Sequence, residues 1–125
     1  MGLQRGSRAR AFAGGVLCAN SLGHLASAAA GKEHLTPLAG RRSGPAVNAV
    51  WGLLNLGGGL LLGRAAAPPG RRWGAELHAF GAGAAGFALW MAVSNRVLQT
   101  NTGAAPRSRA QGVSAHARAG DRRRP

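Results

Sequence analysis

Three apolar stretches separated by short polar segments dominate the pattern of hydrophobic and polar positions along the chain. They cover residues 11–30, 45–63 and 77–95. Each is close to the ~20 residues that an α-helix needs to cross the hydrocarbon core of a bilayer. Pro45 suits the first turn of the second helix, where the missing N–H has no intrahelical partner to lose. The pattern predicts an all-α protein, a three-helix transmembrane bundle.

The remaining sequence divides the chain into three parts. Residues 1–10 form a basic N-terminal segment, residues 11–95 a membrane domain, and residues 96–125 a basic tail of Ala, Arg, Gly, Ser and Pro. The tail has no apolar period, so we expect it to be disordered. A second interpretation is open for residues 1–28, because a basic start, a short apolar run and small residues at Ala26-Ser27-Ala28 are also typical of a cleaved signal peptide.

At the helical period, each apolar stretch has one small and polar face opposite a bulky face. The small faces consist of Asn20, Gly23, His24 and Ser27 in the first stretch, Asn48, Gly52, Asn55, Gly59 and Gly63 in the second, and His78, Ala82, Ala85 and Ala92 in the third. An unpaired amide facing hydrocarbon costs several kcal/mol, so we expect these faces to pack together.

Small residues should mark the places where the helices approach closely. The expected packing positions are Gly15, Gly23, Gly52, Gly59 and Gly63. The same arrangement gives a compact bundle, with the bulky faces turned outward.

Four polar residues should converge near the segment that connects the first two helices. These two helices must run antiparallel, which brings Asn20, His24, Asn48 and Asn55 to similar depths; we call them the polar seam. One interpretation is interhelical hydrogen bonding that fixes the register of the helices. The other is a polar ligand pocket or a path through the bilayer, because ionisable groups inside membranes commonly have a function.

The stretch "NSLGHLASAAAGKEHLTPL…SGPAVNAVWGLLNL" carries a motif of polar and small residues. The motif is an Asn, a His four residues later, a Gly, a Thr-Pro in the loop and Asn-x2-Trp-Gly-x2-Asn. It falls on Asn20, His24, Gly31, Thr36, Pro37, Asn48, Trp51, Gly52 and Asn55. In these residues the chain resembles a family of small, uncharacterised bacterial three-helix membrane proteins. The resemblance covers roughly residues 15–60. It implies a membrane location and brings no activity or ligand.

Composition supports a location in the cell membrane as a multi-pass protein. The chain has 21 Gly, and much of its 46% hydrophobic fraction is alanine, so a soluble core would bury little apolar area per residue. Small side chains become useful in lipid, where they let helices approach. The expected partners are the lipid bilayer and either a second copy of the chain or other membrane proteins.

The charge balance offers one alternative function. Lys and Arg number 16 against 3 Asp and Glu, a net charge of +13. A basic nucleic-acid-binding protein is therefore the alternative, with the Arg-rich tail as its contact. The segment "RSRAQGVSAHARAGDRRRP" lacks aromatic residues for stacking on bases, which favours anionic lipid as the partner of the tail.

The residues for catalysis are sparse. The carboxylates are Glu33, Glu76 and Asp121, and their separation along the chain predicts no acid/base pair. Cys18 lies on the bulky face, with no base expected beside it. His24 and His34 alone are too few ligands for a metal. We therefore expect no enzyme, no cofactor and no metal, but a structural or interaction subunit or a small transporter-like module.

Overall fold

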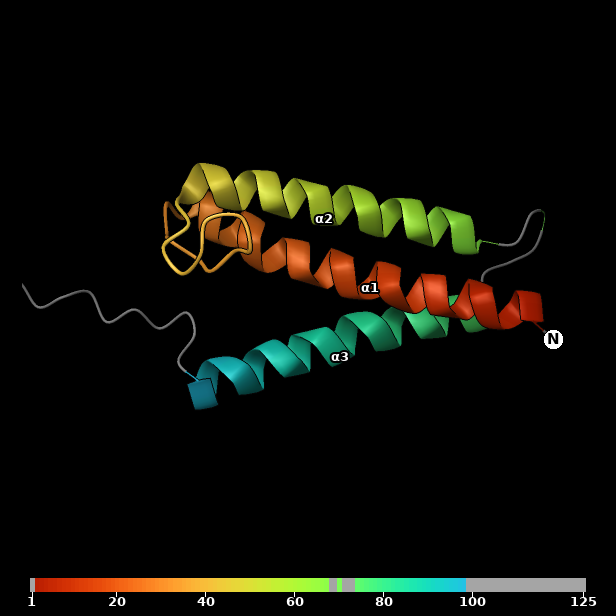
Figure 1. Cartoon of the computed structure of the whole chain (residues 1–125). Helices are drawn as coiled ribbons and strands as arrows, with labels where there is room; N and C mark the ends of the chain where they lie inside the picture. Colours follow the sequence, from red (N-terminus) through yellow and green to blue (C-terminus); the bar gives the residue numbers. More distant parts are fainter. Residues whose placement is uncertain (1, 68–69, 71–73, 99–125) are drawn as a thin grey trace, which may run out of the picture.

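The computed structural model describes residues 2–67, 70 and 74–98, and in these residues it has three α-helices and no β-strand. The helices are α1 (Gly2–Ala29), α2 (Pro45–Ala66) and α3 (Ala75–Leu98). Helix α1 lies between the other two; α2 runs antiparallel to it and α3 runs in the same direction as α1 (Figure 1). The all-α class with three helices is therefore confirmed. The tail predicted to be disordered lies outside the described residues from position 99 onward.

Helix α1 is longer than its apolar stretch. It begins at Gly2, so most of the N-terminal segment that the sequence set apart as residues 1–10 is helical. The reason is local: Leu, Gln, Arg and Ala in this segment are strong helix formers and no proline interrupts them. Arg10 also donates from Nε to the carbonyl of Gly6 across one turn, at 3.2 Å.

A left-handed glycine ends α1. Gly31 has a φ of 64° and donates its N–H to the carbonyl of Ala28 at 3.1 Å, while Lys32 donates to the carbonyl of Ser27 at 2.9 Å. These two bonds form a Schellman motif, in which glycine is preferred because it lacks a Cβ. The chain then turns back into the loop of residues 30–44.

Helices α2 and α3 also extend beyond their predicted bounds. Pro45 occupies the first turn of α2, as predicted, and the helix continues past Gly63 to Ala66. Helix α3 continues through Arg96 to Leu98, so the first residues assigned to the tail are helical.

Glycines set the distance between α1 and α2. A Cβ built on Gly14 would lie 2.9 Å from the carbonyl oxygen of Gly59, and a Cβ on Gly59 would lie 2.9 Å from that of Gly14. Near the other end, a Cβ on Gly52 would lie 2.8 Å from the Leu25 side chain. The buried face of α2 comprises Asn48, Gly52, Asn55, Gly59, Gly63 and Ala66, which includes the whole small face expected from the sequence.

A second pair of glycines forms the contact between α1 and α3. A Cβ on Gly15 would collide with the backbone carbonyl of Phe80, and one on Gly83 would collide with that of Phe12. The two backbones therefore touch at this crossing. Gly15 is a packing glycine, but its partner is α3, whereas Gly83 was not among the expected packing positions.

Two expectations for α1 need correction. Gly23 is exposed, and a Cβ there would meet nothing within 4 Å, so it has no packing role in this fold. Cys18 is half-buried and its Sγ lies against Gly59, so it faces α2 although the sequence placed it on the outward face. The side chain occupies space that the missing Cβ of the glycine leaves open.

The inward face of α3 is the opposite of the expected one. The small residues His78, Ala82, Ala85 and Ala92 are exposed. Gly83 is buried, while Phe80 and Phe87 on the same helical face are half-buried. The crossing with α1 requires Gly83 to face inward, and its neighbours at helical spacing are bulky. The close backbone contact at Gly83 therefore determines which face of α3 turns inward, and the pattern of small residues along the helix does not.

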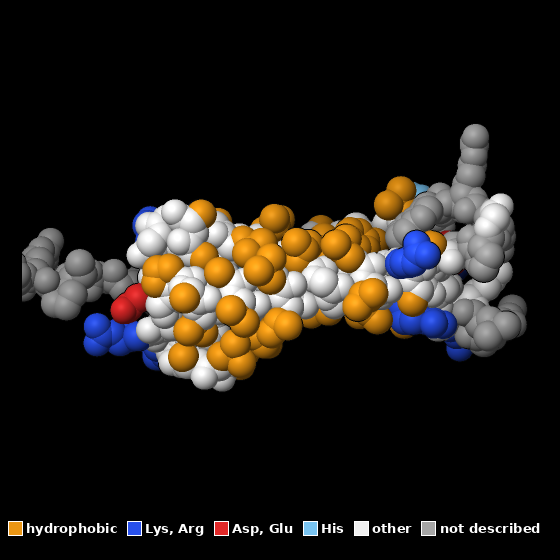
Figure 2. All heavy atoms as spheres, turned by 90° about the horizontal axis from the view of Figure 1, so that it is seen from above, with side chains coloured by type: hydrophobic (Ala, Val, Ile, Leu, Met, Phe, Trp, Pro, Cys, Tyr) orange, Lys and Arg blue, Asp and Glu red, His pale blue; other side chains and the backbone are white. Residues whose placement is uncertain are grey.

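Burial in the described residues is inverted relative to a soluble protein. The buried hydrophobic side chains are Ala11 and Ala66, whereas the buried polar ones are Ser21, His24, Thr36, Ser43, Asn48, Asn55 and Ser94. Large apolar residues such as Leu54, Leu61 and Trp90 are at least 60% exposed. Lys and Arg gather at the two ends of the molecule, with hydrophobic side chains along the length between them (Figure 2).

Two of the described helices, α2 and α3, are long and apolar enough to cross a membrane. The share of their apolar stretches that is buried in the molecule is 28% for α2 and 11% for α3. The core helix of a soluble protein would be mostly buried. Most of the apolar surface of these two helices is therefore left uncovered by the described residues.

Candidate functional site

The polar seam consists of two hydrogen-bonded pairs between α1 and α2. Nδ1 of His24 lies 2.8 Å from Oδ1 of Asn48, and both side chains are buried. Nδ2 of Asn20 donates to Oδ1 of Asn55 at 3.0 Å. The four residues expected to converge are thus brought together, near the loop of residues 30–44. Because α1 and α2 both contribute, the pairs tie the register of one helix to the other.

The amide of Asn48 is oriented by the backbone around it. Its Nδ2 donates to the carbonyl of Ser43 at 2.6 Å and of Gly44 at 3.0 Å, and lies 3.4 Å from that of His34. Both amide hydrogens are therefore committed, and Oδ1 must accept from His24. His24 consequently carries its proton on Nδ1, which leaves the lone pair of Nε2 available as an acceptor when the ring is neutral.

The loop of residues 30–44 is folded tightly over this pair. Oγ1 of Thr36 and Oγ of Ser43 are 2.7 Å apart, and both side chains are buried. Thr36 also exchanges two backbone hydrogen bonds with Gly40, which has a φ of 75°. The backbone N–H of His34 donates to the carbonyl of Ser43 at 3.1 Å. These bonds fix where His34 lies above α1.

His34 is held against His24 by a contact at its own Nδ1. Oγ of Ser27 lies 2.8 Å from the carbonyl of Gly23 and 3.1 Å from Nδ1 of His34, and when its single proton is on the carbonyl it accepts from Nδ1. The two imidazole centroids are 4.7 Å apart, with their planes at 74°. Partial burial and then the nearby His24 lower the pKa of His34, which lies in the loop. The neutral ring is thereby favoured.

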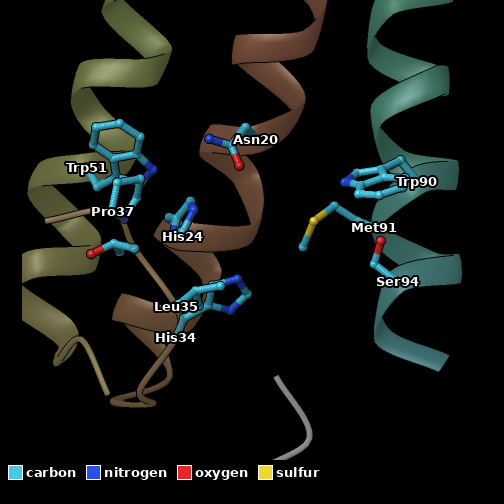
Figure 3. A pocket seen from close by; sticks show the side chains of 10 residues that line it. Asn20, His24, His34, Leu35, Pro37, Trp51, Trp90, Met91 and Ser94 are labelled. Carbon is cyan, nitrogen blue, oxygen red and sulfur yellow. The ribbon is translucent and has the colours of Figure 1, made fainter. Parts of the chain in front are cut away.

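A cleft of about 400 Å³ opens beside the two histidines. Helix α3 separates from α1 beyond their glycine crossing (Figure 1). The residues that line the cleft include members of the second half of α3, of the loop and of the loop end of α1. Figure 3 shows Trp90 and Met91 extending from α3 toward the side of the cleft that His24 and His34 form. Asn20, Leu35, Thr36, Pro37, Trp51 and Ser94 complete its lining.

Ser94 contributes an unsatisfied group to the cleft. The residue is 7% exposed, and its Oγ has no hydrogen-bond partner among the described residues. A buried hydroxyl without a partner costs about 1–3 kcal/mol, so it indicates either strain or a missing partner. Ser94 lines the cleft together with both imidazoles. The site thus presents unused hydrogen-bonding capacity from α1, the loop and α3.

Reasoning from the sequence missed half of this site. His34 was considered only as a metal ligand, because its position over His24 depends on the fold of the loop. Ser94, Trp90 and Met91 were missed because they line the cleft only when α3 presents the face that contains Gly83. The sequence feature that could have indicated this face is Gly83, which lies between two phenylalanines at helical spacing.

The described acidic residues lie outside the cleft. Glu33 forms an exposed ion pair with Arg42, with 3.4 Å between Oε2 and Nε, and Glu76 accepts a hydrogen bond from Ser7 at 3.1 Å. Across the described part of the chain, no three His, Cys, Asp or Glu side chains lie together as a metal would require. The chemistry that this arrangement offers is hydrogen bonding beside an apolar surface.

The chain was compared with protein-family models, curated proteins and solved structures. No protein-family model, curated protein or solved structure matches the chain. The case for a function therefore depends on the geometry of the seam and the cleft.

Proposed function

We propose that the chain is a small multi-pass integral membrane protein in which α1, α2 and α3 each cross the bilayer. The inverted burial carries this proposal: polar side chains are inside, and large apolar side chains such as Leu54 and Leu61 face outward. In water such a surface would be an aggregation hazard, whereas in lipid it is the expected exterior.

The distribution of charge supports the same arrangement. Stretches without Lys, Arg, Asp or Glu run from Ala11 to Ala29 in α1, from Pro45 to Gly63 in α2, and from Leu77 to Asn95 in α3. Each has roughly 20 residues, which corresponds to ~30 Å of helix and to the thickness of a hydrocarbon core. The charged groups at the two ends would lie in the headgroup regions.

Helix α1 is the centre of the bundle, and we propose that it is retained rather than cleaved as a signal peptide. Both other helices pack on α1, through Gly14 and Gly15 near its first half and through the polar seam near its second half. Cleavage after residue 28 would remove both contacts and leave Asn48 and Asn55 unpaired in lipid.

Within the membrane, the proposed role is that of a binding module and not of an enzyme. The seam makes α1, α2 and the loop one unit, whereas α3 separates from it and leaves an accessible cleft. The alternative, a nucleic-acid-binding protein, depends on the tail outside the described residues.

Alkaline carbonate extraction of membranes containing a C-terminally tagged chain tests the proposal. We expect full-length protein in the pellet. Leu54→Lys should lower the pelleted amount, because a lysine at mid-helix costs about 2.5–3.5 kcal/mol on insertion, whereas Leu54→Ala should not. Release of the unsubstituted protein into the supernatant, with steeply salt-dependent DNA binding, would instead support the alternative.

A further inference from the structure

The cleft beside His24 and His34 includes polar groups on both of its sides whose hydrogen-bonding capacity is unused in the described structure. Nδ1 of His24 donates to Oδ1 of Asn48 and Nδ1 of His34 is engaged by Oγ of Ser27, which leaves the Nε2 atom of each ring for a ligand. On the facing helix, Oγ of Ser94 is buried and unpartnered. A ligand that donates to imidazole nitrogen and also pairs with a hydroxyl would satisfy groups from both sides of the cleft.

Most of the remaining lining is apolar and partly aromatic, with Asn20 and Thr36 as its polar members. Trp51, Trp90, Met91 and Leu35 surround the polar groups, and the described lining contains no Lys or Arg. Aromatic rings and a thioether pack well against a flat ring. A cleft of about 400 Å³ is far larger than a metal ion requires and fits a small organic molecule. Among the described residues, an anionic head would have no cationic side chain to pair with in this lining.

We propose that this cleft binds a neutral amphiphile whose flat ring head carries hydroxyl groups, the chemistry of a membrane quinol. A ring hydroxyl would donate to Nε2 of His24 or His34, and Ser94 would pair with another ring oxygen. The ring would pack against Trp90 and Met91, and the hydrocarbon tail would extend into lipid. The inference rests on the proposed membrane location, because such a ligand would enter from the bilayer.

Binding of decylubiquinol to the purified full-length protein in detergent tests the inference. Tryptophan fluorescence in a Trp73→Phe background would report on Trp51 and Trp90, which both line the cleft. Decylubiquinone is the matched control ligand, because it has the same ring and tail but no hydroxyl donors. We expect saturable quenching, with the quinol bound about five- to tenfold more tightly than the quinone, as for one net hydrogen bond.

Three variants separate binding from folding. His34→Phe keeps a ring but removes the acceptor, so the preference for quinol over quinone should fall. Ser94→Ala should weaken quinol binding several-fold while leaving the ligand-free melting midpoint unchanged or higher, because it removes an unpartnered buried hydroxyl. His78→Phe is the matched control, since His78 is exposed near the other end of α3 and outside the cleft. It should leave binding unchanged.

Equal affinity for quinol and quinone, or quenching that does not saturate, would overturn the inference. So would quinol binding that Ser94→Ala and His34→Phe both leave unchanged. These results are distinguishable from a failure of the membrane proposal. A protein that stays in the carbonate pellet but does not bind quinol would refute only the ligand, whereas one released from membranes would refute the location whatever it binds.

Discussion

Asn48 is the residue that joins α1, α2 and the loop. Its amide bonds to His24 and to the backbone of Ser43 and Gly44, whereas Asn55 pairs with Asn20 and bonds its own helix at Trp51. Each asparagine makes one interhelical bond, which in membranes averages about 0.6 kcal/mol, and Asn48 makes more bonds to backbone carbonyls than Asn55 does, so its loss should cost more.

We therefore expect Asn48→Leu to destabilise the detergent-solubilised protein by about 2 kcal/mol and Asn55→Leu by about 1 kcal/mol. Thermal melting in detergent measures both. Leu53→Ala is the control, because Leu53 is exposed on α2 and its truncation should change little. Equal midpoints for Asn55→Leu and the unsubstituted protein would show that the Asn20–Asn55 pair adds nothing to stability.

His34 should make stability depend on pH. Its pKa is lowered from 6.5 in the folded protein, by burial and then by His24, so the unfolded chain binds a proton more readily. Stability is therefore fully present above about pH 6.5 and is lost as the pH falls below it. We expect a lower melting midpoint at pH 5.5 than at pH 7.5.

His34→Gln should reduce this pH dependence, because the glutamine amide does not titrate. The ring of His34 contacts the imidazole of His24 from α1 and the hydroxyl of Ser27. Melting curves of both proteins across this pH range make the comparison. A variant that loses as much stability at acid pH as the unsubstituted protein would locate the titrating group elsewhere.

At the scale of the helices, one glycine pair determines how α3 packs. Gly83 meets the backbone of Phe12, so Gly83→Ala should force α1 and α3 apart and lower the melting midpoint. Gly86→Ala lies on the same helix, but its Cβ would meet nothing within 4 Å. It should be neutral or stabilising by up to about 1 kcal/mol, through helix propensity alone. Midpoints that fall equally in the two variants would contradict a specific crossing.

The sequence predicted α2 better than α3, for a physical reason. In α2 the buried glycines Gly52, Gly59 and Gly63 share one face with both asparagines of the seam, so close packing and polar burial favour the same orientation. In α3 the alanines suggested one face, while Gly83 among phenylalanines required another. A pattern of small residues does not distinguish a packing face from a lipid face when alanine is abundant on both.

The seam was predictable and the cleft was not. Asn20, His24, Asn48 and Asn55 follow from helical period and depth in an antiparallel pair, which are local quantities. The cleft depends on the separation of α3 from α1 beyond their crossing and on a loop that places His34. Both are tertiary features, and no short-range pattern in the sequence determines them.

For the molecule as a whole, the three spans that we propose would place the two ends of α1 on opposite sides of a membrane. Arg8 near its start and Arg41 in the loop beyond its end are both exposed. In a Cys18→Ser background, single Arg8→Cys and Arg41→Cys variants can be treated with a membrane-impermeant maleimide in intact cells. We expect one of the two to be labelled at once and the other only after permeabilisation. Because α1 alone separates these positions, labelling of both in intact cells would exclude a transmembrane α1 and leave α2 and α3 as the candidate spans.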